Sequence, residues 1–344
     1  MKAMPSFNRT IHPWNQDIWQ NLTLEPERAN HALLFNGDAG LGKKDLALAL
    51  AHFVLTETHS QSEGLFNAGS HPDLHVIMPE CEIKEDLLGS FAKRYLEHHN
   101  GKPKKVINIE QIRRLSTAMS THPHISSHRV ILIFNAETMN RNAANALLKS
   151  LEEPQQNTLF IIVSDELSKL AKTIRSRCSL ITFRQAGFES AKAWLELDGR
   201  IPKDQIDTYL SMANNQPLES IRLFETGYLN SLKAVFTDVN NLWMQRAEIT
   251  AVAKSWQTIG SSQVVDVLQK LSTDLLRAML SDTTQNVFFP VQQSWVKSSS
   301  GKLCKESLLK LIDELNYSKK MLATSVDELL VLETVANRVA KLPL

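Results

Sequence analysis

A glycine-rich segment near the amino terminus has the spacing of a phosphate-binding loop. Residues 37–44 read Gly-Asp-Ala-Gly-Leu-Gly-Lys-Lys, and they follow a short apolar run and open a helical pattern. Glycines let a backbone wrap phosphate oxygens, the helix N-terminus supplies N–H groups, and a lysine at this spacing reaches the β- and γ-phosphates. The segment therefore predicts a P-loop formed by Gly37, Gly40, Gly42 and Lys43.

The residues that support hydrolysis at such a loop are replaced. A working P-loop follows its lysine with Ser or Thr, whose hydroxyl binds Mg²⁺, whereas this chain has Lys44. P-loop ATPases also end a later strand with an Asp that holds the metal, often followed by a Glu that positions water. Phe134 and Asn135 stand at these two positions, after the apolar run that begins at Arg129. Because Phe binds no metal and neutral Asn is no general base, we expect no steady hydrolysis, while residual nucleotide binding stays open.

Two periodicities alternate in the first half of the chain. Short apolar runs typical of buried strands lie at residues 32–35, 74–78, 129–134, 159–163 and 180–183. Helical patterns lie between them, at residues 43–55, 109–120, 141–153 and 166–172. Strands that alternate with helices predict a parallel sheet with helices on both faces. The polar stretches 56–71 and 81–103 are interpreted as loops or insertions.

After residue 183 the strand pattern stops. Three short helices are predicted at residues 188–195, 203–213 and 218–226, separated by Gly and Pro. From about residue 228 onward the apolar residues follow the 3.6-residue period of long amphipathic helices. We therefore predict an α/β domain followed by all-α structure, divided as residues 1–184, 185–228 and 229–344.

Composition excludes several classes of protein. The 344 residues carry 38 Lys and Arg against 37 Asp and Glu, a balance that argues against a protein whose main role is to coat DNA. Cys81, Cys178 and Cys304 stand far apart, so neither a cysteine-built zinc site nor a disulfide framework is expected. No apolar stretch approaches the roughly 18 residues of a membrane span. These features predict a cytoplasmic protein with no membrane partner.

Several segments resemble the clamp-loader family of AAA+ proteins. Residues 13–14 and 31–37 resemble the opening of its subunits, and the most distinctive match is residues 142–154, which read NAANALLKSLEEP. Residues 173–178, TIRSRC, resemble the Ser-Arg-Cys motif of the family. The resemblance implies a RecA-like AAA+ domain over 1–184, a small helical lid over 185–228 and a helical collar over 229–344. It also implies that Arg177, beside Ser176, is an arginine finger that reaches a neighbouring subunit's nucleotide in trans.

The resemblance carries further implications about function. It implies a non-hydrolysing, stator-like subunit that joins gamma or tau and delta subunits in a loader of the sliding clamp onto primer-template DNA. The whole assembly would have DNA polymerase activity, and this chain would require no cofactor. Many members carry a four-cysteine zinc module after the P-loop helix, but residues 56–71 contain no cysteine, so no zinc is expected. The alternatives are an active gamma- or tau-like ATPase and a P-loop nucleotide kinase.

Overall fold

The computed structural model describes residues 10–24, 30–56, 60–96, 103–280, 287–322, 324 and 326–342. The chain divides into two compact units, residues 1–186 and 187–344. This division lies close to the expected boundary after residue 184. The further separation of a lid from a collar at residue 228 stays a prediction.

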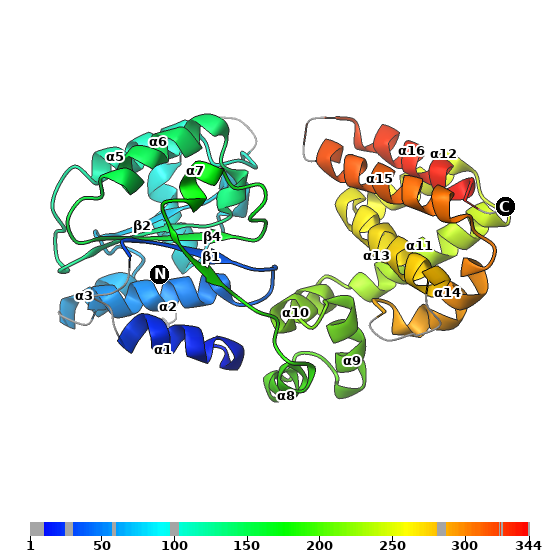
Figure 1. The fold of residues 1–344 in the computed structure, drawn as a ribbon, viewed down its shortest axis with the longest axis horizontal. Helices are drawn as coiled ribbons and strands as arrows, with labels where there is room; N and C mark the ends of the chain where they lie inside the picture. Colours follow the sequence, from blue (N-terminus) through cyan, green and yellow to red (C-terminus); the bar gives the residue numbers. More distant parts are fainter. Residues whose placement is uncertain are drawn as a thin grey trace. The chain divides into compact units, whose positions relative to one another are not determined.

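The first unit is built on a five-stranded parallel sheet, in the order β2-β3-β4-β1-β5 (Figure 1). Its strands are β1 (Ala32–Asn36), β2 (Leu74–Ile77), β3 (Arg129–Ile133), β4 (Thr158–Ser164) and β5 (Ser179–Thr182). All five predicted strands are confirmed. Because the strands are parallel, their carboxyl ends meet at one edge of the sheet, where α/β proteins place their sites.

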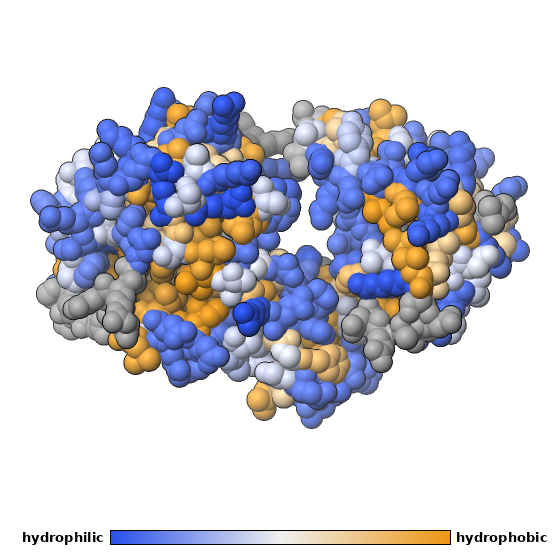
Figure 2. Space-filling model, viewed as in Figure 1, coloured by the Kyte–Doolittle hydropathy of each residue, from blue (hydrophilic) through white to orange (hydrophobic). Residues whose placement is uncertain are grey.

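Helices cover both faces of this sheet, as the alternating pattern predicts. One face carries α1 (Gln16–Leu24), α2 (Lys43–Thr56) and α3 (Ser60–Asn67), and the other carries α5 (Ile109–Ala118) and α6 (Arg141–Glu152) (Figure 1). Alternate residues of β1 enter the two cores, with Leu33 and Phe35 on the α2 side and Leu34 on the α6 side. Figure 2 shows hydrophobic residues gathered at the level of the sheet and α2.

Local signals fix the ends of α6, which contains most of the segment that resembles the clamp-loader family. The Asn140 side chain accepts a hydrogen bond from the Ala143 backbone N–H at 2.8 Å and so caps the first turn. The helix ends at Glu152, two residues before Pro154, because a proline disfavours helical backbone in the residue before it. Glu152 is thereby placed at the C-terminal end of α6.

Three element predictions were wrong. Residues 56–71 contain α3, which forms because Phe66 is buried against the His52 and Phe91 rings despite a polar sequence. Residues 81–103 contain α4 (Leu87–Ala92), flanked by the 3₁₀ turns η3 (Glu80–Glu82) and η4 (Lys93–Tyr95). The helix predicted over 166–172 is instead a pair of tight turns before the short α7 (Lys172–Arg175).

The described part of the second unit is helical throughout. The three short helices are confirmed as α8 (Phe188–Asp198), α9 (Lys203–Met212) and α10 (Pro217–Glu225). The remaining helices are α11 (Tyr228–Trp243), α12 (Ile249–Ile259), α13 (Ser261–Leu280), α14 (Gln293–Ser300), α15 (Lys305–Leu322) and α16 (Glu328–Ala340). Hydrogen bonds connect α11 to other helices of this unit. The Tyr228 hydroxyl donates to Asp266 of α13 at 2.7 Å, and the Trp243 indole donates to the Val339 carbonyl of α16 at 2.9 Å. Within the described residues, every helix is too short or too polar to cross a membrane.

Candidate functional site

The glycine-rich segment forms the connection between β1 and α2, at the carboxyl edge of the sheet. Gly37 has a φ of 153°, and a Cβ at this position would lie 2.8 Å from the Phe183 carbonyl oxygen. Gly42 has a φ of 77°, and a Cβ there would overlap the His12 ring. The loop therefore needs glycine at both positions, for backbone conformation and for close packing.

Residues just before α1 form hydrogen bonds with the backbone of the glycine-rich loop. The Trp14 indole N–H and the Asn15 side-chain amide both donate to the Leu41 carbonyl, at 3.0 and 2.8 Å. His12 stacks on Trp14 with ring centroids 4.8 Å apart, and its Nε2 lies 3.0 Å from an Asp45 carboxylate oxygen in the first turn of α2. Residues 12–15 are thus packed against the loop and the start of α2.

The side chain of Lys43 is bound by its own domain. Its Nζ donates to the carbonyl oxygens of Gly37 and Asp38 at 2.6 and 2.5 Å and lies 2.7 Å from a carboxylate oxygen of Asp165. These contacts employ all three N–H donors of the ammonium group. The Lys43 side chain is only 3% exposed, whereas that of Asp165 is 33% exposed. A phosphate that bound to this loop would have to compete with the Asp165 carboxylate for Lys43.

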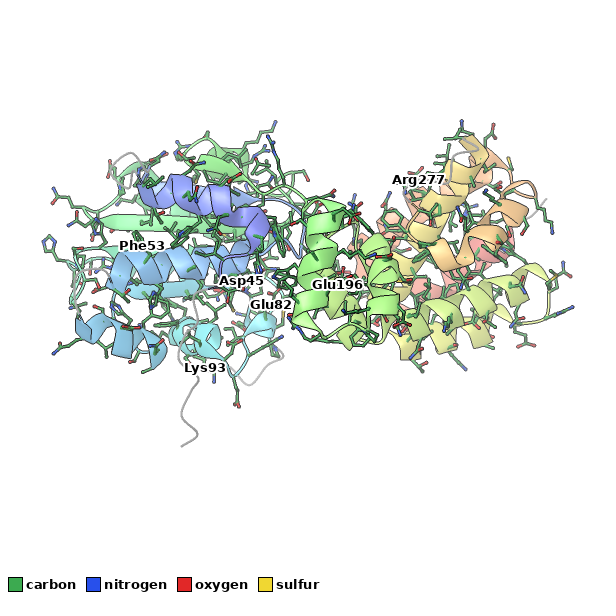
Figure 3. All side chains as sticks on the ribbon, turned by 90° about the horizontal axis from the view of Figure 1, so that it is seen from below. Asp45, Phe53, Glu82, Lys93, Glu196 and Arg277 are labelled. Atoms are coloured by element: carbon green, nitrogen blue, oxygen red, sulfur yellow. The ribbon has the colours of Figure 1, made fainter. Side chains whose placement is uncertain are left out.

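Two of the three replaced positions contact one acidic residue, and the third lies beside the lysine of that pair. Glu82 in η3 lies 3.1 Å from Lys44 Nζ through one carboxylate oxygen, and its other oxygen accepts from the Asn135 amide at 2.9 Å. The Lys44 ammonium also lies 5.8 Å from the centroid of the Phe134 ring, within the range of a cation–π interaction. Figure 3 shows Glu82 at the same end of the first unit as Asp45, which neighbours Lys44 in sequence. The positions that bind metal and water in an ATPase are therefore occupied here by the Lys44 ammonium and by two side chains connected to it, directly or through Glu82.

A second carboxylate lies near Asp165. Asn135 has left-handed backbone geometry (φ 52°) and leads into the 3₁₀ turn η5 (Ala136–Thr138), which contains Glu137. Burial, together with repulsion from Asp165, raises the pKa of Glu137. Its Oε2 atom is buried without a hydrogen-bond partner among the described residues. Acidic groups of this kind disfavour a further anion nearby.

Arg177 lies on a different part of the same unit, just after α7. Its Nη1 donates to the Thr173 carbonyl oxygen at 2.9 Å and to the Ser176 hydroxyl at 3.3 Å. Its Nη2 forms an ion pair with Glu152 at the end of α6, and the Arg177 side chain is 33% exposed. Burial raises the pKa of the neighbouring Cys178 thiol to about 11, which suits a packed apolar residue better than a reactive one.

Histidines in and near residues 56–71, where the resemblance places a zinc module in many family members, have other partners. His52 packs edge-on against Phe66, while His71 lies 3.2 Å from the Ser126 hydroxyl. His75 hydrogen-bonds to the hydroxyl of Tyr95. Across the part of the chain that the structure describes, no group of three or more His, Cys, Asp or Glu side chains could hold one metal ion.

Four residues in these contacts were not given roles from the sequence. Asp165 directly follows the apolar run of β4, so the rule that parallel strands end at one edge could have placed it beside Lys43. Glu82 fell in a stretch interpreted as a loop, and His12 precedes every predicted element. Glu152 was part of the clamp-loader segment, but sequence spacing gives no sign of its contact with Arg177.

The strand order and the glycine loop between β1 and α2 define a P-loop domain of the AAA+ class. A family model described as "DNA polymerase III, delta subunit" matches residues 14–187, just over half of the chain. The chain therefore belongs to the DNA polymerase III delta-subunit family, and the expected membership in the clamp-loader family is confirmed.

Two named relatives and one solved structure are similar to this chain. A protein named DNA polymerase III subunit delta-prime from Pseudomonas aeruginosa is 27% identical over 345 residues, covering 97% of this chain and 98% of the relative. The protein of the same name from Haemophilus influenzae is 29% identical over 65% of this chain and 64% of its own length. A solved structure of a gamma subunit-related protein from Thermotoga maritima is similar at a TM-score of 0.47, with 15% identity over 94% of this chain and 98% of that one.

Proposed function

We propose that this chain is a non-hydrolysing, stator-like delta-prime subunit of the DNA polymerase III clamp loader. It would join gamma or tau and delta subunits and help to load the sliding clamp onto primed DNA. The observation that carries the proposal is the cluster around Glu82, which links Lys44 and Asn135 at two positions where an ATPase needs a metal ligand and a base. The delta-prime names of the relatives support the same assignment.

The chemistry of this cluster opposes hydrolysis. A Mg²⁺ ion at the usual place would meet the Lys44 ammonium instead of a hydroxyl, and Phe134 offers it no oxygen. Glu82 provides a carboxylate beside these positions, but its two oxygens already contact the Lys44 ammonium and the Asn135 amide. With Lys43 also paired to Asp165, the domain needs neither nucleotide nor metal to satisfy the charges of its loop.

Arg177 would act on a neighbouring subunit. A guanidinium is permanently charged and presents a planar fork of donors that matches phosphate oxygens, which suits a finger directed at a γ-phosphate. One third of the Arg177 side chain is exposed, and it follows a short helix at the surface of the unit. The trans role itself is inferred from the Ser-Arg-Cys resemblance, because the geometry of a single chain does not identify the neighbouring subunit.

The test of the proposed function uses the purified chain and the assembled loader. The chain alone should show no Mg²⁺-dependent ATP turnover, and it should nevertheless be required for clamp loading when mixed with gamma or tau, delta, the clamp and primed DNA. Turnover by the chain alone that disappears in Lys43→Ala would instead establish the active ATPase. Phosphoryl transfer to a nucleotide acceptor would instead identify a kinase.

A further inference from the structure

The guanidinium of Arg177 contacts three groups of its own chain through its two terminal nitrogens. Nη1 reaches back to the carbonyl of Thr173, four residues earlier, and to the hydroxyl of Ser176. Nη2 is paired with the carboxylate of Glu152 from a different helix. The side chain therefore folds back along α7 instead of extending away from the unit.

The position of Glu152 is unfavourable for its own helix. The C-terminal end of a helix carries unpaired carbonyls and partial negative charge, so a carboxylate in the last turn is destabilising unless a cation compensates it. Glu152 is the last residue of α6, and Arg177 is the cation that pairs with it. Glu153, the next residue, is also exposed but takes no part in this pair. The contact with Arg177 thus accounts for an acidic residue that the helix itself does not favour.

We propose that Glu152 is a positioning residue that keeps Arg177 retracted until the terminal phosphate of a neighbouring subunit's nucleotide takes the guanidinium over. This inference rests on the proposed trans role of Arg177. A carboxylate and a phosphate would compete for the same fork of donors, and two anions side by side repel each other. The phosphate carries more charge and more acceptor oxygens than the carboxylate, so it displaces Glu152 from the Arg177 guanidinium when nucleotide is bound.

The partial exposure of both partners sets the size of the effect. The Glu152 side chain is 48% exposed and that of Arg177 is 33% exposed, so solvent screens their attraction. Exposed pairs of this kind shift an equilibrium by about two- to five-fold. An ion pair of this strength favours the retracted orientation of Arg177, and a phosphate can still displace Glu152 from it.

The test compares loaders assembled with full-length Glu152→Gln, Glu153→Gln or Arg177→Ala. The Glu153→Gln variant is the matched control, because it removes the same charge one residue away. DNA-stimulated ATP hydrolysis is measured over a range of ATP concentrations, and the turnover lost in Arg177→Ala identifies the site that faces this chain. For that portion, Glu152→Gln should lower the half-saturating ATP concentration about two- to five-fold and leave the maximal rate unchanged.

The possible results separate the inference from the proposed function. A fall in the maximal rate of Glu152→Gln would overturn the inference, since Glu152 would then orient Arg177 for catalysis instead of restraining it. Identical kinetics for Glu152→Gln and Glu153→Gln, with Arg177→Ala impaired, would also overturn it while leaving the trans role intact. If Arg177→Ala itself behaves as the unsubstituted chain does, the trans role fails, and the inference fails with it.

Discussion

Replacing Asp165 with Asn should open the glycine loop to anions at a modest cost in stability. In the native chain the Asp165 carboxylate occupies one of the three donors of Lys43 and places a negative charge beside the loop. Asparagine has the same shape and keeps an acceptor oxygen, but it removes that charge. Lys43 would keep its bonds to the Gly37 and Asp38 carbonyls, so its ammonium would not be left without partners.

The expected loss of stability follows from the burial of the pair. Breaking a fully buried ion pair costs about 3–5 kcal/mol, but Asp165 is one third exposed and Asn still accepts a hydrogen bond. The change resembles the replacement of a charge-assisted hydrogen bond by a neutral one, which costs about 1–2 kcal/mol. Because loss of the competing charge favours a bound anion by a similar or larger amount, binding of nucleotide should tighten about ten-fold.

The assay is a titration with a fluorescent ATP analogue, with and without Mg²⁺, together with thermal unfolding. The control is Asp17→Asn, which removes the same charge from an exposed position on α1. Asp165→Asn should unfold at a lower temperature and bind the analogue more tightly, with no gain from Mg²⁺, because Lys44 and Phe134 provide no metal ligand. Unchanged stability and unchanged affinity, equal to those of Asp17→Asn, would refute the reasoning that Asp165 occupies Lys43.

Further predictions concern the loop backbone and the acid sensitivity of the first unit. Gly42→Ala should lower the free energy of unfolding by at least about 1–2 kcal/mol, because φ is 77° there and a Cβ would overlap His12; equal stability in urea unfolding would exclude this constraint. Burial, together with the charges of Arg129 and Arg94, lowers the pKa of His75 to about 3. His75 therefore stays neutral in the folded chain while it gains a proton in the unfolded chain below about pH 6.5. Its contribution to stability is complete above that pH and falls by about 1.4 kcal/mol per pH unit as the pH drops toward 3. Stability measured from pH 7 to pH 4 should decline less steeply in His75→Gln, and parallel curves would contradict the assignment.

The sequence was sufficient for the elements that bury apolar runs. The strands could be predicted because β1, β3 and β4 lie inside the sheet and are apolar on both faces, which leaves short continuous hydrophobic segments. Helix α3 could not be predicted, since its polar sequence is held by a few tertiary contacts such as that of Phe66 with Phe91. The turns at 166–170 were mistaken for a helix because the spacing of apolar residues does not distinguish two successive turns from a short helix.

The candidate site divides in a similar way. Glycine spacing and strand ends were enough to predict where Lys43, Lys44, Phe134 and Asn135 lie in the fold, because the chain order of a P-loop domain fixes these positions. The partners of these residues could not be identified, because the direction of a side chain depends on which loops meet in space. Glu82 lies 53 positions before Asn135 and still accepts its amide hydrogen bond. The ion pair of Arg177 with Glu152 joins residues 25 positions apart, and sequence spacing gave no sign of it.

The central claim is that this chain contributes to its neighbour's hydrolysis and performs none of its own. The most direct measurement is DNA-stimulated ATP turnover by the reconstituted loader, with Lys43→Ala and Arg177→Ala compared in the same preparation and Arg175→Ala as the control for lost charge. A trans arginine finger can contribute about 10³-fold or more to turnover at its site. We predict that Arg177→Ala loses the share of turnover that comes from the site facing this chain, whereas Lys43→Ala and Arg175→Ala keep the full rate. Loss of turnover in Lys43→Ala with a normal rate in Arg177→Ala would contradict the account.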